Sequence, residues 1–229
     1  MRLDILKALN EERAARRAAV VVTHQESGAQ RLVTARDVAA DPLGAVLEEH
    51  LRTGKSGMED TPEGQVFLTV HVPSPKLVIT GAVHISQALA PIGRLVGYDV
   101  TIVDPRTAFA TPERFPDVKL LAEWPDVALP PIGIDRYTAF VALTHDPKID
   151  DPGLTLALKS DCFYIGALGS RKTHARRVAR LKEERGFTDN EIGRIHSPIG
   201  LDIGAVSPAE IAVAIMGEIT ARLRQVEAA

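Results

Sequence analysis

Two polar loops hold the residues of this 229-residue sequence that are best suited to chemistry. Residues 166–172, GALGSRK, combine two glycines and a serine with two cations at the start of a helical pattern. Free backbone amides at a helix N-terminus, together with Arg171 and Lys172, would hold a phosphate or a similar anion. Arg171 can contact a phosphate through two parallel hydrogen bonds. The same cations could equally form only the solvated face of a helix.

A second loop, Thr144-His145-Asp146-Pro147, follows an apolar run at residues 138–143. That run suits a strand buried on both faces of a parallel sheet. Ligands bind beyond the carboxyl ends of such strands, which is where this tetrapeptide falls. His145 titrates near neutral pH and could exchange a proton, while Asp146 could orient a ligand. Asp146 before a proline could instead only shape a turn.

The element that must position these loops is a βαβ unit at residues 76–106. Its order is an apolar run, Gly81, an amphipathic segment, a second β-rich run and Asp104. This order predicts the opening unit of a dinucleotide-binding fold. Asp104 follows Gly81 at close to the ~20-residue spacing expected of an acid that binds ribose hydroxyls. The unit therefore favours a nucleotide-like ligand, although it could also be a scaffold alone.

The glycine pattern of this first turn is incomplete. The template G-x-G-x-x-G is filled by Gly81, Val83 and Ser86. The turn can form, but the β-branched Val83 stands where a pyrophosphate normally approaches the backbone. His84 comes in the first helical turn, where it could reach a ligand or simply cover the sheet edge.

Further apolar runs extend the domain beyond the first unit. Strands are predicted at residues 118–121, 138–143, 162–165 and 195–199. A helix over residues 173–185 ends at Gly186, and a capping box at Ser207 opens a C-terminal helix whose apolar side carries Ile211, Ile215, Ile219 and Leu223. The fold class is therefore α/β: a Rossmann-like, doubly wound, mostly parallel sheet over residues 76–229 with a small N-terminal α/β lobe.

Residues 1–75 make up the predicted lobe. A helix begins it, β-rich runs follow at residues 18–23 and 31–34, and Asp41-Pro42 reads as the N-cap and first residue of a second helix. A turn at residues 61–64 and an alternating run at 65–72 predict a hairpin. Pro73 and Pro75 mark the domain boundary.

Composition excludes several classes of function. The net charge of -3 gives no general attraction to nucleic acid or to an anionic membrane. The first residues carry acids and no apolar core, so we expect neither a signal peptide nor a membrane span, and a cytoplasmic protein. The single cysteine, Cys162, excludes an internal disulfide and reads as a buried strand residue. The histidines lack metal-ligand spacing, so no metal site is predicted.

Four loops together, GAVHIS, THDP, GALGSRKTHARR and PIGLDIGAVSPAEIA, resemble the xanthine dehydrogenase accessory family (XdhC/CoxI), specifically its Rossmann domain. The resemblance implies a maturation factor that binds molybdenum cofactor (molybdopterin) and assists its sulfuration and insertion into an apo molybdenum hydroxylase. It implies an accessory protein more than a catalyst, and it assigns no catalytic residue. The cofactor-binding candidates are Gly81, Val83, His84, Asp104, Arg106, Thr144, His145, Asp146, Gly166, Gly169, Ser170, Arg171, Lys172 and Asp202.

Two other functions stay open on the residues alone. The βαβ unit and Asp104 are also typical of an NAD(P)-dependent oxidoreductase of Rossmann type. Alternatively, the chain is a non-catalytic adaptor that docks on the hydroxylase through its N-terminal lobe. A sulfur-donor protein and a second copy of the chain, as a homodimer, are further candidate partners.

Overall fold

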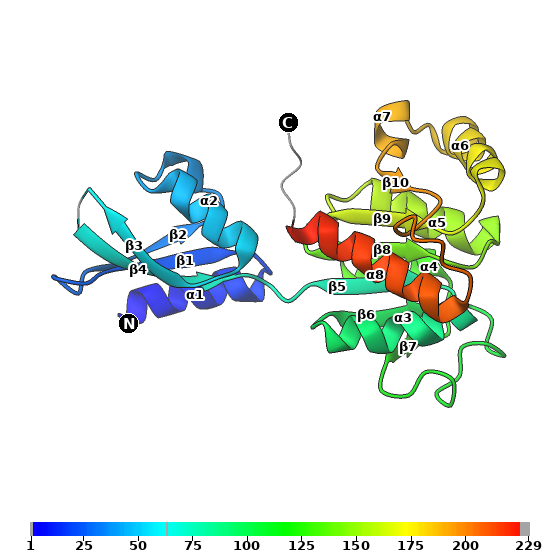
Figure 1. The fold of residues 1–229 in the computed structure, drawn as a ribbon, viewed down its shortest axis with the longest axis horizontal. Helices are drawn as coiled ribbons and strands as arrows, with labels where there is room; N and C mark the ends of the chain where they lie inside the picture. Colours follow the sequence, from blue (N-terminus) through cyan, green and yellow to red (C-terminus); the bar gives the residue numbers. More distant parts are fainter. Residues whose placement is uncertain (1, 63, 225–229) are drawn as a thin grey trace. The chain divides into compact units, whose positions relative to one another are not determined.

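The computed structural model describes residues 2–62 and 64–224, and the chain divides into two compact units, Met1–Pro73 and Ser74–Ala229 (Figure 1). The first unit contains α1 (Leu3–Ala14), β1 (Ala19–His24), β2 (Gln30–Thr34), a 3-10 helix (Val38–Ala40), α2 (Gly44–Thr53), β3 (Gly57–Thr61) and β4 (Gly64–His71). Its four strands form an antiparallel sheet in the order β2-β1-β4-β3. The pairing of β3 with β4 confirms the predicted hairpin, while Glu63 of its turn lies outside the described residues.

Strand β1 is apolar on both faces because a helix covers each side of this sheet. Ala19 and Val21 pack with residues of α1, whereas Val20 and Val22 pack with Leu47 of α2. The predicted start of α2 is wrong by two residues, since the helix begins at Gly44. The Asp41 carboxylate accepts a hydrogen bond from the Leu43 amide and pairs with Arg31 of β2. It therefore shapes the turn before the helix rather than capping the helix itself.

The second unit is a six-stranded sheet with helices on both faces, which confirms the Rossmann-like fold. Its elements are β5 (Lys76–Thr80), α3 (His84–Leu95), β6 (Asp99–Val103), β7 (Lys119–Leu121), α4 (Pro125–Ile132), β8 (Thr138–Ala142), α5 (Pro147–Leu158), β9 (Tyr164–Ala167), α6 (Arg171–Arg185), α7 (Asp189–Ile192), β10 (Ile195–His196) and α8 (Pro208–Arg224). The strand order is β7-β6-β5-β8-β9-β10, and every neighbouring pair is parallel. Chain order reverses between β5 and β8, so the topological switch point lies there.

Apolar cores fill both sides of this sheet. Leu77 and Ile79 of β5 pack with α3 and α8, which lie together on one face (Figure 1). Val78 packs on the other face with residues of α4, α5 and α6. Burial on both faces explains why the central strands read as continuous apolar runs in the sequence.

The ends of the helices largely follow their local sequence signals. Gly186 takes a left-handed conformation with φ 72° and ends α6 as predicted. Ser207 and Glu210 form the predicted capping box of α8, with 3.2 Å from the Glu210 amide to Ser207 Oγ and 2.8 Å from the Ser207 amide to Glu210 Oε2. Cys162 is buried as expected, but it precedes β9 instead of lying within it.

Candidate functional site

Gly81 and Thr144 bring two of the candidate loops together at the switch point. Gly81 follows β5 with φ 112°, a conformation that strongly favours glycine. A Cβ placed there would lie 2.8 Å from Thr144 Cγ2, so the space is closed to any other residue. Ser86, at the third position of the glycine template, is buried and its hydroxyl donates a hydrogen bond to the Gly81 carbonyl. The turn therefore forms around one glycine, with Ser86 bracing it from within the helix.

Asp104 is fully buried, which corrects the expectation that it faces a ribose. Its Oδ2 accepts hydrogen bonds from the Ala82 amide and Arg106 Nη2, both at 2.7 Å. Its Oδ1 accepts bonds from the Arg106 amide and Nε, both at 2.9 Å. Burial alone would raise the pKa of Asp104, but the Arg106 and Ala82 hydrogen bonds hold it below its ordinary value. Asp104 thus ties the loop after β6 to the turn after β5.

The loop after β8 is organised by Asp150, which the sequence analysis did not identify. Asp150 lies in the first turn of α5 and is 1% exposed. Its Oδ1 accepts a 2.7 Å hydrogen bond from the Thr144 hydroxyl, and its Oδ2 accepts a 3.0 Å bond from the His145 amide. Burial raises the pKa of Asp150 in spite of these bonds. The buried carboxyl fixes the backbone of the loop from below.

His145 and Asp146 take different roles in this loop. His145 is exposed and has a φ of 63°, an uncommon conformation for a non-glycine residue. Asp146 is the N-cap of α5 and accepts a 3.0 Å hydrogen bond from the Lys148 amide. Of the two alternatives for Asp146, local shaping of the chain is therefore the one the structure displays, while the His145 ring is open to solvent.

The loop after β9 places its glycines differently from each other. Gly169 has a φ of 137° and lies directly before Ser170, whose hydroxyl caps α6 by accepting a hydrogen bond from the Thr173 amide. Gly166 lies inside β9, and a Cβ there would approach Ile199 Cγ1 to 2.7 Å. The structure therefore corrects the place of Gly166: it allows close packing within the sheet and is not part of an open anion cradle.

Arg171 and Lys172 are exposed in the first turn of α6, and the buried cation of this helix is Arg177, which sequence reasoning missed. Arg177 is 2% exposed, and its Nη2 donates a 2.8 Å hydrogen bond to the Leu168 carbonyl. Its Nε is buried without a hydrogen-bond partner in the described part of the chain. Burial lowers the pKa of Arg177. Its spacing from other arginines gave no signal, because all of them fit a solvated face.

A pocket of about 150 Å³ connects the loops after β8 and β9. Its lining comprises His145, Pro147, Asp150, Asp151, Thr173, Arg176, Arg177 and Arg180. Arg180 Nε donates a 2.6 Å hydrogen bond to Asp151 Oδ2, so that pair is already neutralised. The pocket brings His145 to the start of α6, as expected for loops that share one sheet edge.

The remaining candidates lie around this edge. Arg106 is about one-third exposed, and its pKa is raised by the Asp104 hydrogen bond and, less strongly, by the charges of Asp146 and Asp150. Val83 packs partly onto the core, whereas His84 is exposed at the start of α3. Asp202 is exposed between β10 and α8, and within residues 2–62 and 64–224 no hydrogen bond or ion pair links it to the other candidates.

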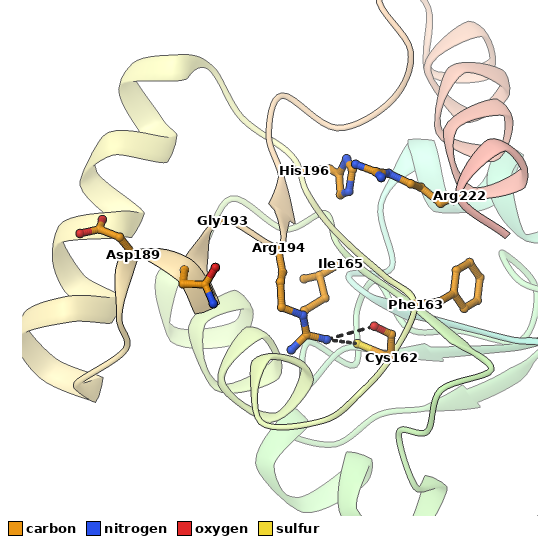
Figure 2. Close-up of a pocket in the computed structure, with 9 residues that line it drawn as sticks. Cys162, Phe163, Ile165, Asp189, Gly193, Arg194, His196 and Arg222 are labelled. Carbon is orange, nitrogen blue, oxygen red and sulfur yellow. Dashed lines mark hydrogen bonds between the residues drawn. The ribbon is translucent and has the colours of Figure 1, made fainter. Parts of the chain in front are cut away.

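A larger pocket, of about 590 Å³, lies at the amino ends of β9 and β10 (Figure 2). Its lining includes Cys162, Phe163, Arg194 and His196. Figure 2 shows the Arg194 guanidinium directed at Cys162, where it donates a 3.0 Å hydrogen bond to the carbonyl oxygen. Burial raises the pKa of the Cys162 thiol. Since ligands of this fold bind at the carboxyl ends of the strands, the smaller pocket is the better candidate.

Two other kinds of functional element are absent from the residues that the structure describes. None of their helices combines the length and apolar character that a membrane span requires. None of their histidine, cysteine, aspartate and glutamate side chains gather in groups of three or more suited to a metal ion.

Comparisons with known proteins agree with this geometry. Residues 77–219 match the family model described as the XdhC Rossmann domain. "Uncharacterized protein YqeB" of Escherichia coli (strain K12) is 33% identical over 156 residues, which cover 67% of this chain and 28% of that protein. A probable xanthine dehydrogenase component of Bacillus subtilis (strain 168) is 31% identical over 155 residues, covering 67% of this chain and 44% of that protein.

Two further proteins match more of the chain. "Molybdenum cofactor insertion chaperone PaoD" of Escherichia coli (strain K12) is 28% identical over 206 residues, 82% of this chain and 58% of that protein. The chain therefore spans about a quarter to three-fifths of these curated relatives. A crystal structure titled as a xanthine dehydrogenase from Bacillus halodurans shares the fold, with a TM-score of 0.68 and 22% identity over 98% of this chain and 65% of that one. The family match covers most of the second unit, and the chain belongs to the XdhC Rossmann domain family.

Proposed function

We propose that this protein binds molybdenum cofactor and assists its sulfuration and insertion into a molybdenum hydroxylase such as xanthine dehydrogenase. The names of two relatives, a cofactor insertion chaperone and a probable xanthine dehydrogenase component, support this proposal. The observation that carries it is the pocket at the carboxyl edge of the sheet, where His145 and the buried Arg177 line one cavity. The same proposal includes a cytoplasmic location and, as partners, the apo hydroxylase, a sulfur donor and a second copy of the chain.

The residues at this edge fit the chemistry of such a cofactor. Molybdenum cofactor is a pterin with a phosphate or a nucleotide extension, so its carrier needs an anion site and polar groups for the ring. Arg177 is a buried cation with an unpartnered Nε, which an anion would compensate. The backbone of the Gly81 turn, Thr144 and His145 would offer polar contacts to the ring. When bound, the cofactor supplies the molybdenum chemistry of the client enzyme.

The two parts of the chain would divide this work. Residues 76–229 would hold the cofactor through the sheet edge, and residues 1–75 would contact the apo hydroxylase. Arg171 and Lys172, both exposed, would attract the anionic cofactor to the first turn of α6.

Gel filtration of the full chain mixed with molybdenum cofactor tests the proposal. Pterin absorbance should elute with the wild-type protein, and His145→Ala and Arg171→Ala should retain less. Arg185→Gln is the matched control, because Arg185 is exposed at the far end of α6. Elution of all pterin in the small-molecule fraction with wild-type protein would refute cofactor binding.

A Rossmann-type NAD(P)-dependent oxidoreductase is the second candidate, favoured by the strand order around the switch point. The burial of Asp104 beneath Arg106 argues against it, because the acid that would bind the ribose is already fully hydrogen-bonded. A fluorescence titration with NADH and NADPH separates the two functions. Micromolar binding would favour the oxidoreductase, and no change in fluorescence would remove it.

A further inference from the structure

The first three turns of α6 contain an unusual arrangement of charge around the 150 Å³ pocket. Three guanidinium groups, those of Arg176, Arg177 and Arg180, line it together with two carboxyl groups, Asp150 and Asp151. Arg180 and Asp151 neutralise each other through two hydrogen bonds of 2.6 and 3.2 Å. Two cations and one carboxyl therefore remain to set the character of the cavity.

The remaining carboxyl is turned away from these cations. Both Asp150 oxygens accept hydrogen bonds from the loop after β8, namely from the Thr144 hydroxyl and the His145 amide. Across residues 2–62 and 64–224, neither Arg176 nor Arg177 has a carboxylate within ion-pair distance. An unpaired cation that is 2% exposed is costly, and an anion in the adjoining space would offset that cost.

The size of the cavity limits what the anion can be. Water occupies about 30 Å³ per molecule in the liquid, so 150 Å³ corresponds to about five waters. That is enough for one tetrahedral oxyanion, but small-molecule sites that enclose a whole ligand are about 300 Å³ or larger. The cavity is therefore of a size for a charged end group, and the rest of a ligand would lie outside it.

We propose that this pocket binds a single phosphoryl group, with Arg177 at its base and Arg176 at its mouth. The proposal deepens the proposed function and rests on it only in naming the pterin cofactor's own phosphate as the phosphoryl group that is bound. Arg177 holds the Leu168 carbonyl through Nη2, which keeps the guanidinium in place beneath the loop after β9. The anion site then consists of side chains of the second turn of α6, and Arg171 in the first turn is outside it.

Titration of the full chain with inorganic phosphate, followed by ³¹P NMR, tests this site directly. Wild type should show saturable binding, and Arg177→Gln should weaken it about tenfold or more, as expected for the loss of a charge-assisted hydrogen bond. Arg176→Gln should weaken binding severalfold. Because Arg176 is exposed, this variant keeps the inference testable if Arg177→Gln fails to fold. Arg185→Gln removes the same charge from the far end of the helix and should bind as wild type does.

Several results would overturn the inference. Absence of saturable phosphate binding by wild type would do so, and so would a larger loss in Arg171→Gln than in Arg176→Gln. The cofactor is measured separately, by gel filtration with the same variants. Undiminished cofactor retention by Arg176→Gln and Arg177→Gln would refute the phosphoryl subsite and leave the proposed function standing. Phosphate binding without cofactor retention would refute the proposed function and support the subsite; tight binding of NADH that these variants abolish would assign the phosphoryl group to a dinucleotide.

Discussion

Replacement of Asp104 with alanine should strongly destabilise the second unit, because it removes an acceptor that serves four hydrogen bonds. The side chain is fully buried, and its loss leaves the Ala82 amide and the Arg106 guanidinium without their partner. Removing one member of a buried ion pair costs about 3–5 kcal/mol. Arg106 is one-third exposed and can be rehydrated, so we expect the lower end, about 3 kcal/mol.

Urea denaturation measures this loss, and Asp146→Ala is its control. Asp146 also accepts a backbone hydrogen bond but only as a helix cap, so its removal should cost about 1 kcal/mol. In thermal unfolding, the Asp104→Ala loss corresponds to about 6–12 °C for a unit of this size. A loss of less than about 1 kcal/mol for Asp104→Ala, or one equal to that of Asp146→Ala, would refute the view that this buried pair ties the two loops.

The pH dependence gives an independent check. The pKa of Asp104 is lowered in the folded protein, so the unfolded chain binds the proton more tightly. The stabilisation is then fully present above the unfolded pKa of about 3.9 and is lost as pH falls through the folded value. The difference in stability between wild type and Asp104→Asn should be constant from about pH 5 to 8 and should shrink below about pH 4.

Three further predictions concern single positions. Gly81→Ala should cost at least about 2 kcal/mol in urea, because it adds a backbone penalty to a clash with Thr144; Gly204→Ala, with a φ of 73° and open space around the Cα, should cost only about 1 kcal/mol. Asp150 has a raised pKa, so it lowers stability as pH rises from about 4 through its folded pKa; Asp150→Asn should flatten that slope in urea titrations between pH 4 and 8. Ser207→Ala should cost about 1 kcal/mol by circular dichroism of thermal unfolding, and an unchanged midpoint would contradict the capping role.

The central strands of the second unit could be predicted from sequence because burial on both faces leaves a continuous apolar run. Helix α5 could not, since Pro152 and the buried acids Asp150 and Asp151 interrupt its apolar spacing. Those acids are tolerated inside only because Thr144 and Arg180 satisfy them, and these are contacts between distant segments.

The candidate site was predictable in its loops but not in its roles. Asp104 has the expected spacing from Gly81, yet spacing alone does not reveal that Arg106, two residues later, occupies the carboxylate. Arg177 is one of several arginines in α6, and only the packing of α6 beside α5 decides which of them is buried. Local sequence therefore identifies the candidate edge of the sheet, whereas tertiary contacts select the residues that line its pocket.

The contact between Gly81 and Thr144 has a consequence for how β5 tolerates insertions. Leu77 and Ile79 face one core and Val78 the other, so sliding the strand by one position would still bury apolar side chains on both sides. Hydrophobicity alone does not choose between these two frames. The slide would, however, bring the Cβ of Thr80 or Ala82 against Thr144, where only glycine fits. The residue that opens the site thus also determines which side chains of β5 enter which core, and a one-residue insertion in this strand would damage the site before it damaged the core.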